Sequence, residues 1–421
     1  GNLYWWVSLR EDNMYLVFAR KYRPQTLDEV IGQDIVTQTI KNAIEQNRLY
    51  HSILFYGTMG TGKTSLARII AKSLNCEKGP TVEPCGKCEH CRAISEGKSV
   101  DVIEIDGASN RRIDDARNII ESIKYVPFSA RYKIFIIDEV HMLTEEAFNA
   151  LLKTIEEPPD YVKFIFATTN IEKVPQTILS RCQIFKLNKI SPQKIYEKLK
   201  KILETENINM QDEGIKLISQ IAQGSFRVAE NYLDRVVAYK NDNITAKDVS
   251  DVLGVADFGL IDDFVDSLVS FNADLTFEKL NYLFERNLKV ETFVELLLEK
   301  LLTLSIDLEL KAAFINIFYD AFLQIKYKVD DAVTLKVATQ KALSLKNLTK
   351  IEEIIKLTYS LDLDKKIQTH IQSVEGITQG KLDNINTIET NNVSLQNITN
   401  ETDRLEKFVI DLFDAEIIAK R

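Results

Sequence analysis

The feature that most constrains this chain is a short glycine-rich stretch, Gly57–Thr64. The apolar run that ends at Tyr56 predicts a strand before it, and the segment from Ser65 to Ala71 predicts a helix after it. The backbone N–H groups of such a loop and the dipole of the following helix bind phosphate groups. The sequence therefore predicts a phosphate-binding loop and a nucleoside triphosphate ligand.

Two side chains at the end of the loop have distinct expected roles. We expect Lys63 to reach the β- and γ-phosphates, and the Thr64 hydroxyl to bind Mg²⁺. The remaining loop residues would contact the nucleotide mainly through their backbone. The predicted nucleotide-binding set is Gly57, Thr58, Met59, Gly60, Thr61, Gly62, Lys63, Thr64 and Ser65.

Apolar runs that alternate with helical periodicity predict an α/β domain over residues 14–190. Continuous apolarity is typical of parallel strands that are covered on both faces, and strands separated by helices predict a doubly wound parallel sheet. In such a sheet the nucleotide binds at the carboxyl ends of the strands. The expected strands are Ile53–Tyr56, Val102–Ile105, Ile134–Ile137, Phe164–Ala167 and Ile184–Leu187.

The pattern after residue 190 is purely helical. Segments 192–205, 212–223 and 226–240 predict a small bundle over 191–243, and a second helical block follows over 244–365. We interpret two apolar stripes in that block as core rather than as a subunit interface. These stripes are Leu260, Phe264 and Leu268, and Phe293, Leu296, Leu297, Leu301 and Leu304.

Residues 366–421 predict a flexible tail with a terminal amphipathic helix. Its apolar face, with Leu405, Phe408, Val409, Leu412 and Phe413, would dock on a partner or on the chain itself, and the sequence leaves both open. At the other end, residues 1–13 hold both tryptophans, Trp5 and Trp6. We expect them to form an extension outside the fold, with Met14 as the natural start; a short extra strand or helix is the alternative.

Composition excludes some classes of function. The chain has 421 residues and a formal net charge of −9, which argues against a surface that binds nucleic acid all over but allows a local basic groove. No apolar stretch approaches the roughly 20 residues needed to cross a bilayer. The start does not resemble a secretory signal, so we expect a cytoplasmic protein without a membrane partner.

A second apolar strand carries the other half of the expected site. Ile134–Ile137 is followed directly by Asp138 and Glu139. We expect Asp138 to hold the Mg²⁺ shell and Glu139 to orient and deprotonate the attacking water. A strand end that merely faces solvent is the alternative, but the phosphate loop upstream favours the functional interpretation. Thr169 follows the next strand, where a polar side chain could contact the water or the γ-phosphate.

Four of the five cysteines have the spacing of metal ligands. Cys85, Cys88 and Cys91, with Cys76 upstream, supply enough thiolates for a closed tetrahedral Zn²⁺ shell, which has a structural role. Disulfides are the alternative, but a reducing compartment favours zinc. His90 is a substitute ligand that four sulfurs make unnecessary.

Together these motifs resemble one family, the clamp-loader ATPases. The resemblance lies in Ala19–Thr26 with Val30–Gln33, in Asp138–His141, in Leu151–Pro159 and in Ser180–Cys182. With the four-cysteine insert it is specifically to the gamma/tau subunits of bacterial DNA polymerase III. It is strong from about residue 15 to 240, weaker to about 365, and not evident beyond.

The resemblance implies an AAA+ P-loop domain with a zinc insert over residues 76–91, followed by a helical lid and an all-α collar. It implies an ATPase that uses ATP, Mg²⁺ and structural Zn²⁺, and that acts in a ring to open the sliding clamp and load it onto primed DNA. The implied partners are further copies of the chain, delta- and delta-prime-type subunits, the clamp, primed DNA and, through the tail, the polymerase core.

The resemblance also implies roles for single residues. Thr169 matches the first sensor, Arg181 the arginine finger that reaches a neighbour's γ-phosphate, and Arg227 the second sensor in the lid. Val228 stands where the family usually has an acidic residue, which puts the pairing of the lid at that position in doubt. By the same resemblance, Arg23 and Pro24 would line the adenine pocket. Arg111, Arg112 and Lys153 would face DNA phosphates. Without the resemblance, we would interpret these three cations as solvated helix ends.

Two rival functions belong to other classes. A scaffold that does not hydrolyse ATP would tie polymerase to helicase, but the intact Lys63, Asp138 and Glu139 argue against a dead site. A branch-migration motor would share the loop but lack the cysteine insert. The motifs by themselves therefore predict an ATPase, and the family resemblance implies that this ATPase is a clamp-loader subunit.

Overall fold

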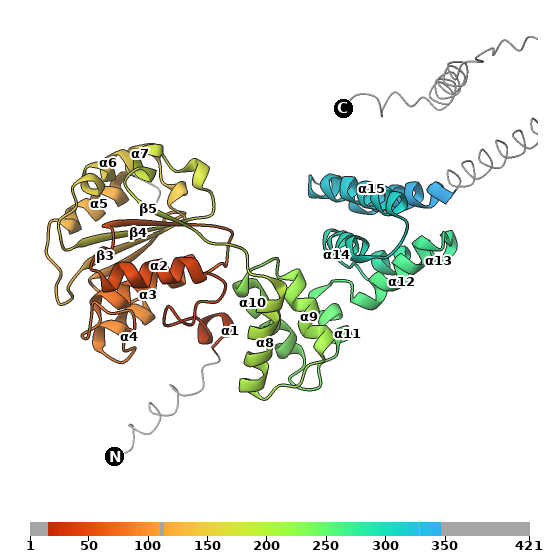
Figure 1. Cartoon of the computed structure of the whole chain (residues 1–421), viewed down its shortest axis with the longest axis horizontal. Coiled ribbons are helices and arrows are strands. Elements are labelled where there is room, and N and C mark those ends of the chain that lie inside the picture. Colours follow the sequence, from red (N-terminus) through yellow and green to blue (C-terminus); the bar gives the residue numbers. More distant parts are fainter. Residues whose placement is uncertain (1–15, 110–112, 328, 347–421) are drawn as a thin grey trace, which may run out of the picture. The chain divides into compact units, whose positions relative to one another are not determined.

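The computed structural model describes residues 16–109, 113–327 and 329–346. Within them, five strands form one parallel sheet in the order β2-β3-β4-β1-β5 (Figure 1). The strands are β1 Ser52–Tyr56, β2 Val102–Asp106, β3 Lys133–Asp138, β4 Val162–Thr168 and β5 Gln183–Lys186. All of the predicted strand segments are confirmed, with ends that differ by one or two residues.

The register of the central strands brings the functional positions together. Tyr56 at the end of β1 pairs with Thr168 at the end of β4, and Ile137 of β3 pairs with Phe166 of β4. Because parallel strands end at the same edge of a sheet, the segments that follow β1, β3 and β4 lie next to one another. That edge carries the phosphate loop, Asp138 and Glu139, and Thr169.

Helices cover both faces of the sheet (Figure 1). α2 Asp34–Glu45, α3 Lys63–Asn75 and α4 Glu89–Glu96 pack on one face through a core that includes Ile40, Ile70 and Ile94. α5 Ile113–Ile123, α6 Glu145–Glu156 and α7 Gln176–Leu179 pack on the other. The central strands β3 and β4 are mainly apolar and almost entirely buried because helices cover both of their faces, as the doubly wound prediction requires, whereas the outer strands β2 and β5 have exposed polar positions.

The three predicted helices after the sheet are α8 Pro192–Glu206, α9 Asp212–Ile221 and α10 Phe226–Tyr239. Ser191 and Ser225 begin α8 and α10, because their hydroxyls accept hydrogen bonds from the backbone of the first turn. α11 Ala246–Leu253 packs against α9 and α10. α1 Phe18–Lys21 also packs on α10, and the Phe18 N–H donates to the Asp234 carboxylate at 2.9 Å.

The next helices are α12 Phe258–Val269, α13 Ala273–Glu285, α14 Val290–Thr303 and α15 Leu308–Lys326, and residues 331–346 are also helical. Both apolar stripes are core, as predicted. Phe264 packs edge-on against Phe293, with ring centroids 5.2 Å apart, and each is at most 1% exposed. Two short 3-10 helices, η1 Val140–Met142 and η2 Ile171–Lys173, follow β3 and β4.

Some predictions fall outside the described residues: the 1–13 extension, the basic pair Arg111 and Arg112, and the tail with its terminal helix. The domain divisions at 190, 243 and 365 stay predictions, although α11 packs with the helices before it. None of the described helices is both long and apolar enough to span a bilayer.

Candidate functional site

The phosphate loop connects β1 to α3 through a backbone that needs glycine. Gly60 has φ +78°, and a Cβ there would lie 1.9 Å from Ser225 Oγ on the lid side of the site. Gly57 is similarly restricted, because its Cβ would lie 2.4 Å from the backbone oxygen of Leu187. The loop therefore packs closely against the chain that leads into the lid, and only glycine fits there.

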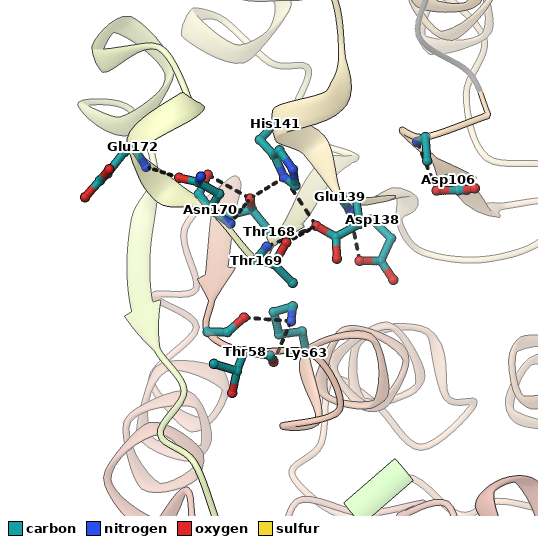
Figure 2. Close-up of polar contacts among 12 residues, drawn as sticks. Thr58, Lys63, Asp106, Asp138, Glu139, His141, Thr168, Thr169, Asn170 and Glu172 are labelled. Carbon is teal, nitrogen blue, oxygen red and sulfur yellow. Dashed lines mark hydrogen bonds and ion pairs between the residues drawn. The ribbon is translucent and has the colours of Figure 1, made fainter. Parts of the chain in front are cut away.

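Lys63 and Thr64 begin α3 and point into the site. Lys63 is 6% exposed, and its Nζ donates to the backbone oxygens of Gly57 and Thr58 at 2.9 Å each (Figure 2). Burial lowers the pKa of Lys63, while Glu139 and Asp138 favour its charged form. Thr64 Oγ1 donates to Asp138 Oδ2 at 2.6 Å. The two predicted Mg²⁺ ligands are thus in contact and fit a hard cation with oxygen ligands.

Glu139 lies just beyond the end of β3 in a left-handed conformation, with φ +46° and ψ +47°. That conformation costs a non-glycine residue roughly 1–2 kcal/mol, so its surroundings must hold it in place. Thr169 does so from the end of β4, because its N–H and its Oγ1 donate to Glu139 Oε2 at 3.0 and 2.8 Å (Figure 2). The predicted base and the predicted first sensor are therefore hydrogen-bonded to each other.

His141 is a third member of this cluster that the sequence did not assign. Its Nδ1 lies 3.2 Å from Glu139 Oε2 and 2.9 Å from Thr168 Oγ1 (Figure 2). The Thr168 hydroxyl has one hydrogen, which it donates to the Asn170 backbone oxygen at 3.1 Å. A proton on His141 Nδ1 would let the ring donate to both oxygens. The only sequence signal for this role was its place two residues after Glu139.

A cavity of about 710 Å³ joins the loop, the strand ends and the lid helices. Most of the predicted nucleotide-binding residues line it. They are Arg23, Pro24, Met59, Gly60, Thr61, Gly62, Lys63, Thr64, Ser65, Asp138, Glu139 and Arg227. Sequence reasoning missed Asp106 at the end of β2, although an apolar strand that ends in Asp is the same signal that identified Asp138.

Charged side chains from the lid form another wall of the cavity. Lys198 of α8 pairs with Glu230 of α10 at 2.7 Å and lies over the ring of Phe226, 4.4 Å from its centroid. Burial raises the pKa of Glu230, and Lys198 opposes that rise. Val228 stands at the position where the family usually has an acidic residue. Glu230, two residues further along α10, supplies a carboxylate to the cavity lining. Arg227 is exposed and lines the same cavity.

Residues 22–33, which connect α1 to α2 and are called the strap below, form a further part of the cavity lining. Arg23 and Pro24 line the cavity together with Val30 and Ile31. Burial lowers the pKa of Arg23, as does the nearby charge of Arg68. This combination of apolar side chains with a cation suits a nucleobase.

Arg181 and Lys153 lie outside that lining. Arg181 follows α7, forms an ion pair with Glu156 of α6, and donates to the Thr177 backbone oxygen at 2.7 Å and to Ser180 Oγ at 3.0 Å. Its side chain is 36% exposed. Lys153 is exposed on α6, where its charge is accessible to solvent.

The four predicted metal ligands converge. The sulfurs of Cys76, Cys85, Cys88 and Cys91 all lie within 4.8 Å of one another, and none of these cysteines, all in the described residues, forms a disulfide. Backbone N–H groups of Lys87 and Cys88 lower the pKa of Cys85 to about 6, which favours a thiolate. Four soft sulfurs in this cluster fit Zn²⁺ in a closed tetrahedral shell.

Part of this sequence is similar to the sequences of known proteins. The family model described as DNA polymerase III, delta subunit, matches residues 32–191. The DNA polymerase III subunit gamma of Buchnera aphidicola subsp. Acyrthosiphon pisum is 46% identical over 241 residues, which is 57% of this chain and 67% of that protein. The chain belongs to the DNA polymerase III gamma/tau family.

Longer relatives of the gamma/tau family extend well past the match. DNA polymerase III subunit tau of Escherichia coli is 42% identical over 66% of this chain, and subunit tau/gamma of Haemophilus influenzae is 44% identical over 62%. The chain spans 44% and 38% of the length of these two proteins. A solved Thermotoga maritima RuvB structure aligns at 21% identity over 59% of this chain and 79% of that chain, with a TM-score of 0.42, which is too weak to bear on this chain.

Family membership and the sheet agree on the fold. It is an AAA+ P-loop domain with a four-cysteine insert, followed by helices. The strand that carries Thr169 lies between the strand of the loop and the strand of Asp138. Thr169, which follows β4, therefore lies between the glycine-rich loop after β1 and the Asp138–Glu139 pair after β3 in this gamma/tau chain.

Proposed function

We propose that this chain is an ATP-dependent clamp-loader subunit of the bacterial replicative polymerase, which hydrolyses ATP to load the sliding clamp onto primed DNA. The observation that carries this proposal is the convergence of Lys63, Thr64, Asp138, Glu139 and Thr169 at one edge of the sheet. Membership of the gamma/tau family supports the choice among ATPases.

Binding of ATP would occur in the cavity between the strap and the lid. The loop from Gly57 to Ser65 would bind the phosphates, Lys63 would turn from its backbone acceptors to the β- and γ-phosphates, and Arg23 and Pro24 would hold the adenine. Thr64 and Asp138 would hold Mg²⁺, which neutralises charge on the transferred phosphoryl group.

Hydrolysis would use Glu139 as the base for the attacking water. Its carboxylate is held by Thr169 and His141, which fixes the orientation of the oxygen that is to accept the proton. Thr169 would also sense the γ-phosphate as the first sensor, and Arg227 would do so from the lid. ATP would stabilise the clamp-binding conformation, and hydrolysis would remove that bias.

Arg181 would act in the site of the neighbouring subunit. It lies outside the cavity lining of its own chain, and its guanidinium is partly exposed, which supports a role in trans. A guanidinium at the γ-phosphate stabilises the charge of the transition state and makes hydrolysis depend on assembly.

The assembly proposed here is a ring of several copies with delta- and delta-prime-type subunits, joined by the collar in the cytoplasm. The ring would hold the clamp open at primed DNA, with Arg111, Arg112 and Lys153 against its phosphates, and the tail would contact the polymerase core. Contacts of this kind are insensitive to base sequence and weaken with salt.

We further propose a structural Zn²⁺ on Cys76, Cys85, Cys88 and Cys91. Protein purified without chelator should contain about one zinc per chain by elemental analysis. Stoichiometric absence of zinc would contradict this assignment.

One assay separates the proposed function from its rivals. ATP hydrolysis is measured for the complete loader with and without clamp and primed DNA. A clamp loader is stimulated by both, a non-hydrolysing scaffold by neither, and a branch-migration motor would displace strands without a clamp. Absence of stimulation by clamp and primed DNA together would contradict the proposal.

A further inference from the structure

A single helix connects the phosphate loop to the cysteine module. α3 begins at Lys63 and Thr64, and its C-cap is Cys76, the first of the four cysteines. The Cys76 backbone oxygen accepts a hydrogen bond from Arg131, which fixes this end of the helix. The nucleotide-binding and metal-binding residues thus occupy opposite ends of one rigid element.

A second helix returns from the module to the nucleotide cavity. Cys88 is the N-cap of α4, and Cys91 lies in its first turn. Ile94 is 2% exposed and joins the core beneath α3, so α4 is packed along the phosphate-loop helix. Gly97, the C-cap of α4, lines the nucleotide cavity. α4 therefore begins in the cysteine module and ends at the proposed ATP site.

Gln25 joins the two helices to the strap. Its Oε1 accepts hydrogen bonds from Lys72 Nζ of α3 at 2.7 Å and from Ser95 Oγ of α4 at 3.2 Å, and Lys72 also donates to the Gln25 backbone oxygen at 2.9 Å. Gln25 Nε2 donates to the Arg23 backbone oxygen at 3.0 Å. Gln25 thus connects α3 and α4 to the cavity residues Arg23 and Pro24, the latter being its neighbour in the chain.

Lys72 is the buried member of this network. It is 2% exposed, and no carboxylate in the described part of the chain forms an ion pair with it. Burial lowers its pKa, while Cys91 and Glu29 favour its charged form. Lys72 lies one helical turn before Cys76, and its backbone oxygen accepts a hydrogen bond from the Cys76 N–H at 2.8 Å. A metal that orders the cysteine module would therefore also order the turn of α3 from which Lys72 holds Gln25.

We propose that Gln25 and Lys72 couple the cysteine module to the nucleotide pocket, so that zinc binding raises the affinity for ATP by holding the strap in place. Gln25 and Lys72 act as positioning residues, because neither touches the phosphates in the proposed binding mode. This inference rests on the proposed function of Gly57–Thr64 as an ATP site.

The first test is Lys72→Met, which removes both donated bonds and leaves the buried stem. Affinity for a fluorescent ATP analogue should fall about fivefold to tenfold, the size of the net contribution of one ordinary hydrogen bond, while zinc content stays at about one per chain. Lys163→Met is the matched control. Lys163 is also buried, at 8% exposed, and donates to the backbone oxygens of Leu49 and Tyr50, neither of which lines the cavity or contacts Gln25. The ATP affinity of Lys163→Met should be unchanged, and circular dichroism checks that both variants fold.

Zinc removal completes the test. Chelation should lower the ATP affinity of the unmodified chain by about fivefold to tenfold but add little to the loss in Lys72→Met, because coupled changes are not additive. The exposed variant Gln25→Ala gives a second measurement that does not disturb the core, and it should behave like Lys72→Met. Equal ATP affinity with and without zinc would overturn the coupling and leave the proposed function intact. Failure of the zinc-loaded, unmodified chain to bind ATP would contradict the proposed function itself.

Discussion

The edge of the sheet and the surface around Arg181 differ in how their functional groups are held. At the edge, Lys63, Thr64, Asp138 and Glu139 bond to one another or to neighbouring backbone and line one cavity. Arg181 instead bonds to α6 and α7, outside that cavity. Under the proposed function, one chain would hold the groups that bind ATP and activate water, whereas Arg181 would supply a cation to the neighbouring subunit.

The largest effect is expected for Arg181→Ala. Within the complete ring, turnover should fall by about 10³-fold or more, because an arginine finger contributes about that much to phosphoryl transfer. ATP affinity of the isolated chain should not change. The control is Arg48→Ala, an exposed arginine after α2. Normal hydrolysis by Arg181→Ala in the complete ring would contradict the proposed role of Arg181 in the site of the neighbouring subunit.

Glu139→Gln tests the proposed water-activating group at the edge of the sheet. Loss of the base should reduce turnover by about 10²- to 10⁴-fold while ATP binding persists, since the amide keeps the shape and can still accept from Thr169. Single-turnover hydrolysis and equilibrium binding measured on the same sample separate the two effects. A parallel loss of binding would show that Glu139 holds the nucleotide rather than activating water.

Lys63→Ala should act on binding rather than on chemistry. The loss of a charge-assisted contact to the phosphates should weaken ATP affinity by about 100-fold, measured by titration with a fluorescent analogue. Lys201→Ala, at an exposed position of α8, is the control. Wild-type affinity in Lys63→Ala would mean that the cavity does not hold the phosphates at the loop.

The sequence predicted most of the fold because its signals are local. Apolar runs, a glycine-rich loop and carboxylates at a strand end identified the strands, Lys63 and Asp138 without knowledge of which strands are neighbours. The pairing of β4 with both β1 and β3 could not be predicted from the sequence, because it depends on contacts between distant segments of the chain. For the same reason the bond from Phe18 to Asp234, the position of Glu230 and the link through Gln25 required coordinates.

The smallest effect is expected for Glu156→Gln, which removes the ion pair that holds Arg181 on its own chain. Both side chains are partly exposed, and such pairs contribute at most about 1 kcal/mol. Turnover of the complete ring should therefore change by less than about fivefold, with an unchanged thermal unfolding temperature. A loss as large as that of Arg181→Ala would mean that Glu156 has a direct role in hydrolysis.

The most direct test of a cation supplied by the neighbouring subunit is a mixed assembly. Rings are formed with Lys63→Ala chains, which keep Arg181 but bind ATP about 100-fold more weakly and are left empty at a low ATP concentration, and with Arg181→Ala chains, which bind ATP but lack the cation. Each variant alone should give an inactive ring, and the mixture should regain hydrolysis wherever an Arg181→Ala site adjoins a Lys63→Ala subunit. A mixture as inactive as its components would contradict the account.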